Sequence, residues 1–350
     1  MNQWKFRLGL TLVWLSAASL LHAIYSPPFD LDRSAGTAHT IVVGIMRPDS
    51  TLEVTDVLKG MVHTGDRLKL DRSGYDFGHI AKSMGESGDV EMVGFLSEPL
   101  DNGAYRLSSY FVGISSSGKV FTWLESKFSM TGSSFEAHPS WTKDSFTSDI
   151  RRRIQAKIKL DAILEQPRSR QRMRELIGFL RANVSPEPER ALSMWHRRGF
   201  LFGHAMQQIS EPSAEEEKTL VESLLSSADA HEQVLILDIM AGAHASIGVF
   251  EAARSFTRAG INSVVRRSAF DAIAAVDPYE AADVLSSYLV FDEPDLDSVI
   301  TALGACGNMR EPKRMSLRVV KPLQVVAKQT FERCRVSKSN EDGNRGYKIL

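Results

Sequence analysis

The sequence predicts an α+β protein with more than one domain, in which a small antiparallel β-barrel or sandwich precedes an α-solenoid of helical pairs. Three observations support this prediction. The chain has 350 residues, which is long for one ordinary core. Apolar residues recur with a period of two in the first part of the chain and with a helical period after about residue 145. One supersecondary unit also recurs three times between Ala230 and Gly307.

The composition is that of a globular protein. Hydrophobic residues make up 43% of the chain and charged residues 24%, which is enough apolar material for a core in each domain. The 42 basic and 43 acidic residues nearly cancel, giving a net charge of -1. So small a charge gives no field to attract polyanions, and we expect no nucleic-acid partner.

Residues 1–23 have the parts of an export signal. Lys5 and Arg7 form a short basic start, the apolar run Leu8–Leu21 follows, and small residues lie near its end. The sequence therefore predicts a periplasmic or secreted protein. The alternative is an uncleaved N-terminal membrane anchor, although the run is shorter than the ~20 apolar residues that a span needs.

A β-domain is predicted at residues 38–140, after a linker at 24–37 that contains Ser26-Pro-Pro-Phe29. Short β-branched or alternating segments are separated there by turn residues, with no helical pattern between them. This spacing is typical of a small antiparallel barrel or sandwich. The expected strands are 39–45, 51–58, 66–70, 90–96, 105–107, 110–114 and 119–124.

Four short motifs carry a family resemblance in this region. They are Ile41–Gly44, Val57–Gly60, Gly65-Asp66 and Gly94–Leu96. In this order they resemble the small OB-like, netrin-type β-domain found near the N-terminus of many exported bacterial proteins of unknown role. Animal relatives of that fold inhibit metalloproteases through a cysteine at the mature N-terminus. This chain has no cysteine near its expected cleavage site, so the resemblance does not carry that activity over.

A basic helical linker is predicted at residues 145–188. Thr147-Ser-Asp149 can cap a helix that begins at Ile150, with Ile150, Ile154 and Ile158 along its apolar face. The opposite face is basic and can meet an anionic lipid headgroup, a polyanionic envelope polymer or nucleic acid. An ordinary solvated helix face is the alternative, since no aromatic residues are interleaved for base stacking. The candidate binding residues on this face are Arg151, Arg152, Arg153 and Lys157.

The solenoid is predicted at residues 190–335, followed by a flexible tail at 336–350. Ser213 and Glu216 form a capping-box pattern, and Pro278 and Pro294 stand where helices begin. The expected helices, counted from the basic segment onward, are 168–181, 191–209, 213–226, 231–243, 247–258, 262–275, 278–290, 295–305 and 313–333.

The segment Val265-Arg-Arg-Ser-Ala-Phe-Asp-Ala-Ile273 resembles the helix pattern V-R-x-x-A-x-x-A-L of short bacterial HEAT-like repeats. The repeats align on the apolar anchors Ile239, Ile273 and Leu303, which are 34 and 30 residues apart, a period typical of stacked helical pairs. In such repeats the arginine of this helix braces neighbouring repeats. The resemblance therefore implies that Arg266 or Arg267 is structural and assigns neither to a ligand.

Residues for chemistry are sparse. No His pair has the helical spacing of a zinc site, and no phosphate loop, GxSxG elbow or Cys-His signature is present, so we expect no catalytic or metal-binding residues and no cofactor. Cys306 and Cys334 are the two cysteines of the chain. In an oxidising compartment they can form a disulfide; otherwise Cys306 is a small buried residue and Cys334 a free thiol.

The leading functional hypothesis is an exported, non-enzymatic binding or scaffold protein that presents its solenoid surface to a protein partner. One alternative is an envelope hydrolase with a site between the domains, in which His79, His138 or His196 would lie beside acids. The other alternative is a membrane-associated scaffold that makes peripheral contact through the helix that starts at Ile150.

Overall fold

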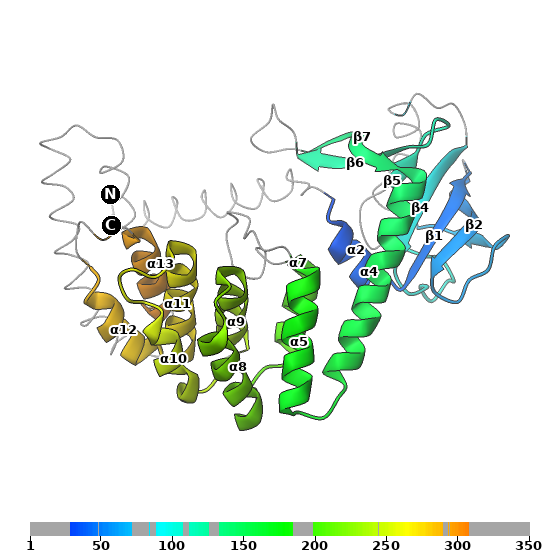
Figure 1. Cartoon of the computed structure of the whole chain (residues 1–350). Coiled ribbons are helices and arrows are strands. Elements are labelled where there is room, and N and C mark those ends of the chain that lie inside the picture. Colours follow the sequence, from blue (N-terminus) through cyan, green and yellow to red (C-terminus); the bar gives the residue numbers. More distant parts are fainter. Residues whose placement is uncertain are drawn as a thin grey trace, which may run out of the picture. The chain divides into compact units, whose positions relative to one another are not determined.

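The computed structural model describes residues 29–47, 49–71, 84, 89–107, 112–125, 133–184, 199–243, 245–289, 293 and 295–307 (Figure 1). The chain is α+β, with an antiparallel seven-stranded sheet followed by helices. It divides between Ile158 and Lys159 into two compact units, which we call unit 1 and unit 2. The predicted export signal, the C-terminal helix at 313–333 and the tail lie outside the described residues.

The sheet of unit 1 has the order β3-β2-β1-β4-β5-β6-β7, and all neighbouring strands are antiparallel. Six of the strands lie within two residues of the predicted bounds. The predicted strand at 105–107 contributes only isolated bridges, from Tyr105 to Leu70 and from Leu107 to Leu96. The strands are β1 (Thr40–Met46), β2 (Thr51–Lys59), β3 (Arg67–Lys69), β4 (Val90–Leu96), β5 (Val112–Ile114), β6 (Lys119–Glu125) and β7 (Ser133–Thr142).

Strand β7 is absent from the sequence prediction. Its sequence, SSFEAHPSWT, has no β-branched residue before its final threonine, and Pro139 lies in the irregular stretch where the register with β6 shifts. Proline lacks the N–H that a central strand needs, so it is tolerated at a sheet edge. β7 pairs with β6 and ends the strand order, which is where Pro139 fits.

Both faces of the sheet are buried, each in its own apolar core. Alternate residues of β1 point to opposite faces, so Ile41 and Val43 join one core while Val42 and Met46 join the other. The first core also contains residues of the helices α2 (Leu31–Thr37) and α4 (Lys143–Leu164). Burial on both faces explains why β1 and β4 are mostly apolar instead of alternating, with Glu91 as the one charged residue in the two strands.

Two helix starts differ from the sequence prediction. Leu31–Thr37, which was assigned to the linker at 24–37, forms α2, because the Asp30 side chain accepts a hydrogen bond from the Arg33 N–H at 3.0 Å. α4 begins at Lys143 and not at Ile150. Thr142 and Ser145 cap it reciprocally, through Ser145 N to Thr142 Oγ1 at 3.3 Å and Thr142 N to Ser145 Oγ at 2.9 Å. Serine takes the place of the usual glutamate or glutamine of a capping box.

Unit 2 consists of helices that pack in chain order. α5 contacts α8, α8 contacts α9, α9 contacts α11, and α11 contacts α13 (Figure 1). The three repeat anchors Ile239, Ile273 and Leu303 are all fully buried. The helices are α5 (Arg170–Asn183), α7 (Gly199–Gln208), α8 (Ala214–Ser226), α9 (Ala230–Gly242), η1 (Ile247–Val249), α10 (Phe250–Ser255), α11 (Ser263–Val276), α12 (Pro278–Ser286) and α13 (Leu296–Gly307).

The predicted helix-start signals of unit 2 are present where the structure describes them. Ser213 and Glu216 form the reciprocal capping box of α8, as predicted. Pro278 is the first residue of α12, and the Asp277 carboxylate accepts hydrogen bonds from the N–H groups of Tyr279 and Glu280 at 3.0 Å each. Pro294 lies outside the described residues.

Two glycines of unit 2 form a matched pair that tests this packing. A Cβ on Gly242 would lie 2.8 Å from Cγ of Met206, so Gly242→Ala requires the buried Met206 side chain to shift and should lower the free energy of unfolding by about 1–3 kcal/mol. Gly178 has open space around it, and Gly178→Ala in α5 should raise that free energy by about 0.5–1 kcal/mol. Urea unfolding followed by circular dichroism measures both. Stabilisation by both changes would contradict the contact between Gly242 and Met206.

Candidate functional site

The predicted basic face of α4 is matched by carboxylates. The Arg151 guanidinium donates to Asp56 at 2.7 Å, and Arg152 donates to Asp149 at 2.9 Å. Arg153 forms an ion pair with Asp32, and burial lowers the pKa of its guanidinium. Lys157 lies partly buried on the same helix. The arginine run therefore does not present three uncompensated positive charges to a lipid or polymer.

The arginines of α5 are paired in the same way. Arg170 forms ion pairs with Glu215 and Glu222 of α8, and Arg181 contacts Asp229 at 3.1 Å and Glu232 at 3.3 Å. Arg172 is buried, and its pair with Glu216 is buried too, with a distance of 2.7 Å from Nε to Oε1. These contacts hold α5 against the helices that follow it.

The histidines that the structure describes are not grouped. His138 stacks on Trp141 with 3.6 Å between the ring centroids, and burial lowers the pKa of its imidazole. His204 lies 2.8 Å from Asp161, and His231 is exposed. Within the described ranges no three His, Cys, Asp or Glu side chains are placed to hold a metal ion. The remaining histidines of interest, His79, His196 and His244, lie outside the described residues.

Cys306 is fully buried in α13. Burial raises the pKa of its thiol to about 12, so the group stays protonated at neutral pH and is a poor nucleophile. Cys334 lies outside the described residues, and the disulfide between the two cysteines stays a prediction.

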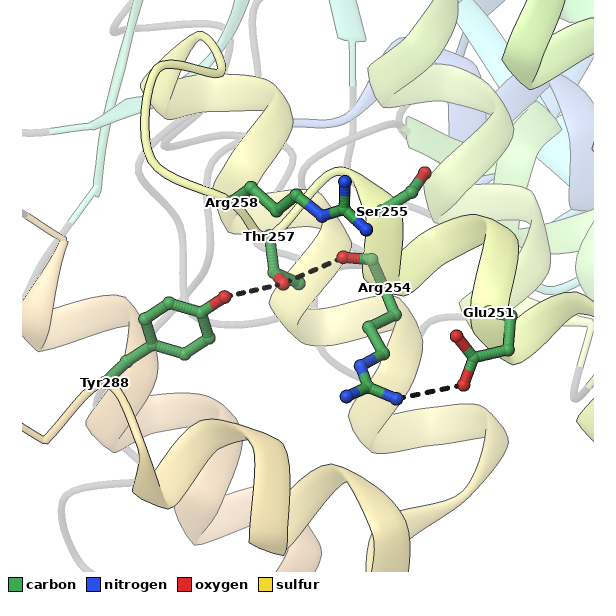
Figure 2. A pocket seen from close by; sticks show the side chains of 6 residues that line it. All are labelled: Glu251, Arg254, Ser255, Thr257, Arg258 and Tyr288. Atoms are coloured by element: carbon green, nitrogen blue, oxygen red, sulfur yellow. Dashed lines mark hydrogen bonds and ion pairs between the residues drawn. The ribbon is translucent and has the colours of Figure 1, made fainter.

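A polar pocket of about 360 Å³ lies in unit 2 (Figure 2). Five of its lining residues come from α10 and the turn after it, and Tyr288 comes from the turn that follows α12. The turn is fixed by Thr257, whose hydroxyl donates to the Arg254 carbonyl at 2.8 Å and lies 3.1 Å from the Tyr288 hydroxyl. The lining residues are Glu251, Arg254, Ser255, Thr257, Arg258 and Tyr288.

The two guanidinium groups of this pocket differ in their partners. Arg254 donates to Glu251 at 3.0 Å and lies 3.8 Å from Glu280. Arg258 is exposed, and its guanidinium forms no hydrogen bond or ion pair with any residue that the structure describes. The pocket thus contains one compensated and one uncompensated positive charge.

Directly behind the pocket lies a buried ion-pair network centred on Arg266. Its Nε donates to the Thr257 carbonyl at 2.7 Å, and its guanidinium binds Glu293 and lies 3.1 Å from Asp295. The Arg266 Cζ atom also lies 5.1 Å from the ring centroid of Tyr288. The network therefore fixes two residues of the pocket wall, Thr257 and Tyr288, from inside the protein.

The sequence alone does not predict this pocket. One local signal was present, because Arg254 and Arg258 are four residues apart and can share one helix face. Tyr288 is separated from both by about thirty residues of sequence, and no local pattern connects it to them. The unpaired state of Arg258 depends on what its neighbours in space do, which spacing alone does not show.

Comparisons of the chain with protein-family models, with curated proteins and with solved structures gave no match. None of the helices in the described part of the chain combines the length and the apolar character needed to cross a membrane. A functional assignment therefore rests on the side chains themselves.

Adjacent arginines test the buried network. Arg266→Met leaves Glu293 and Asp295 buried without their cation and should lower the free energy of unfolding by about 3–5 kcal/mol. The side chain of Arg267 is 56% exposed, so Arg267→Met should change the free energy of unfolding by less than about 1 kcal/mol. Equal losses in urea unfolding of the two variants would refute the central role of Arg266.

The same network makes unit 2 sensitive to acid. Burial opposes ionisation of Glu293, but hydrogen bonds and charge from Arg266 outweigh it, so the pKa of that carboxyl lies below its usual range. A depressed carboxyl pKa stabilises the fold above the pKa of the unfolded chain, and this contribution is lost as the pH falls through the folded-state pKa. Unfolding free energies measured from pH 7 to pH 3 should fall less steeply in Glu293→Gln. If the free energy of unfolding fell equally with pH in Glu293→Gln and in the unmodified protein, Glu293 would not be a source of the acid sensitivity.

Proposed function

We propose that the protein is an exported, non-enzymatic binding or scaffold protein. Its unit 1 is an OB-like β-domain, and its unit 2 is a HEAT-like α-solenoid whose surface binds a protein partner. Export rests on the signal-like pattern of residues 1–23. The OB-like assignment is supported by a single antiparallel sheet, in the described residues, that is buried on both faces.

The observation that carries the solenoid proposal is a brace that occurs twice. Arg172, in the first turn of α5, donates to the Leu164 carbonyl at the end of the preceding helix and to Glu216 at the start of α8. Arg266, near the start of α11, donates to the Thr257 carbonyl just after α10 and to Glu293 and Asp295 just before α13. The presence of the same brace at two places supports a stack of related helical units.

A binding role is favoured because several charged side chains of unit 2 pair with one another between helices and are not gathered into a site. Long arrays of packed helices expose a ridged surface on which a partner can bind. The Ser140 hydroxyl lies 3.2 Å from Nδ1 of His138, but no carboxylate among the described residues pairs with that imidazole. His204 pairs with Asp161, and the only described thiol is buried. A convergent acid–base site of the kind that enzymes need is therefore not part of the proposal.

The two alternatives have less support. Membrane contact through the arginine run of α4 is disfavoured because Arg151, Arg152 and Arg153 each pair with a carboxylate. The hydrolase alternative needs a histidine beside acids. His138 is the described member of that set, and its ring contacts Trp141 and Ser140.

Site-specific photo-crosslinking in the native envelope tests the scaffold proposal. A photoreactive side chain replaces Leu225, Val264 or Tyr279, which are exposed on α8, α11 and α12. We expect one protein to crosslink in fixed stoichiometry from at least one of these positions, because they lie on the proposed binding surface. Met61, which is 86% exposed in unit 1, supplies the control position.

Sequencing of the N-terminus of the purified protein checks export in the same preparation. The proposal expects a mature chain that starts between residues 19 and 24. Crosslinks from Met61 alone, or none from unit 2, would contradict a partner-binding helical surface.

A further inference from the structure

The pocket next to α10 has a defined set of hydrogen-bond donors and acceptors. The Ser255 hydroxyl donates to the Ala252 carbonyl at 2.7 Å, and the Thr257 hydroxyl donates to the Arg254 carbonyl at 2.8 Å. A hydroxyl has one proton, so the contact between Thr257 and Tyr288 uses the proton of Tyr288. The three hydroxyl groups therefore offer acceptor oxygens to the pocket, while the donors are the guanidinium groups.

A ligand that satisfies this set must accept hydrogen bonds from a cation and also donate to oxygen atoms. Inorganic phosphate and sulfate are mainly acceptors, so they leave the hydroxyl oxygens unsatisfied. An acidic polypeptide segment does both, because its side-chain carboxylate accepts and its backbone N–H groups donate. The polar lining also differs from the mostly apolar walls that bind drug-like molecules or cofactors.

We propose that this pocket binds a glutamate or aspartate side chain of the partner polypeptide, with Arg258 as the cation that receives the carboxylate. The proposal rests on the proposed function, since it places one contact of the partner on unit 2. Arg258 is the group to receive it because its charge is not compensated within the described residues, whereas Arg254 is already bound to Glu251.

The pocket is preorganised to do this. Thr257 is 1% exposed, its carbonyl is fixed by Arg266, and Tyr288 packs on Phe270 with 5.6 Å between ring centroids. In Figure 2, Tyr288 lies beside Thr257, Glu251 lies beside Arg254, and the Arg258 side chain extends toward Ser255. A wall that is already rigid costs little entropy to order when a ligand binds.

Glu251 sets the strength of the site. Its carboxylate occupies the Arg254 guanidinium and repels an incoming carboxylate. Glu251→Gln should therefore leave Arg254 with only the more distant Glu280, at 3.8 Å, and make its guanidinium more available to the ligand. Tighter binding in this variant is a result that a purely structural role for these residues does not produce.

The test uses the full mature chain and a fluorescent, C-terminally amidated peptide of alternating glutamate and glycine, read by anisotropy. The glutamine counterpart of the peptide should not bind. Arg258→Gln should weaken binding by about tenfold or more, because a charge-assisted hydrogen bond is lost. Glu251→Gln should tighten it several-fold. Arg267→Gln is the matched control, since Arg267 is exposed and does not line the pocket, and it should leave binding unchanged.

Equal weakening by Arg258→Gln and Arg267→Gln would overturn the proposal, as would displacement of the peptide by equimolar inorganic phosphate or by a short uronic-acid oligomer. The crosslinking experiment distinguishes failure of the pocket proposal from failure of the scaffold proposal. A partner that still crosslinks to unit 2 when Arg258 is glutamine preserves the scaffold function and removes this pocket from it. Peptide binding that depends on Arg258, with no crosslinked partner, preserves the pocket and removes the scaffold function.

Discussion

The buried pairing of arginine with carboxylate is the constraint on which unit 2 depends. An arginine cannot lose its charge in a protein, so burying Arg172 or Arg266 is tolerable only where carboxylates and carbonyls surround it. Each of these guanidinium groups uses its fixed fork of N–H donors to reach the end of one helix and the start of another at the same time. A shift of either helix by one turn would leave a charge without its partner. The ion pairs thereby specify the register in which the helices pack, which apolar contacts alone do less strictly.

The same constraint connects the core of unit 2 to its surface. Thr257 receives Arg266 through its carbonyl and faces the pocket through its hydroxyl, so the buried charge and the exposed site share one residue. Tyr288 also contacts both parts: its ring packs against Arg266, and its hydroxyl lines the pocket. Binding at the pocket and stability of the helix stack are therefore coupled through two side chains. Substitutions at Arg258 and Glu251, which belong only to the surface, can separate the two effects.

Local patterns predicted those parts of the fold that local interactions determine. The strands rich in β-branched residues and the capping box at Ser213 were predicted to within one or two residues, because alternation and capping act over a few positions. Strand β7 was missed because its sequence forms a strand only through pairing with β6. The start of α4 was missed because a serine replaces the usual third residue of the cap. The α+β class followed from the change of period, whereas the pocket needed Tyr288, which only the folded chain brings to Arg254.

Charge shows why the site was harder to predict than the fold. The densest basic run in the sequence, Arg151 to Arg153, is compensated in the structure by acids as distant as Asp56, 95 residues earlier in the chain. Arg258 is not part of a run of like charges, and its guanidinium is uncompensated within the described residues. A run of like charges is costly unless other parts of the fold neutralise it, so such a run tends to recruit partners from its own chain. A single cation on a short turn requires no such compensation and can stay available to a ligand. In this chain, the charge that remains after internal pairing indicates the candidate site better than the density of charge along the sequence.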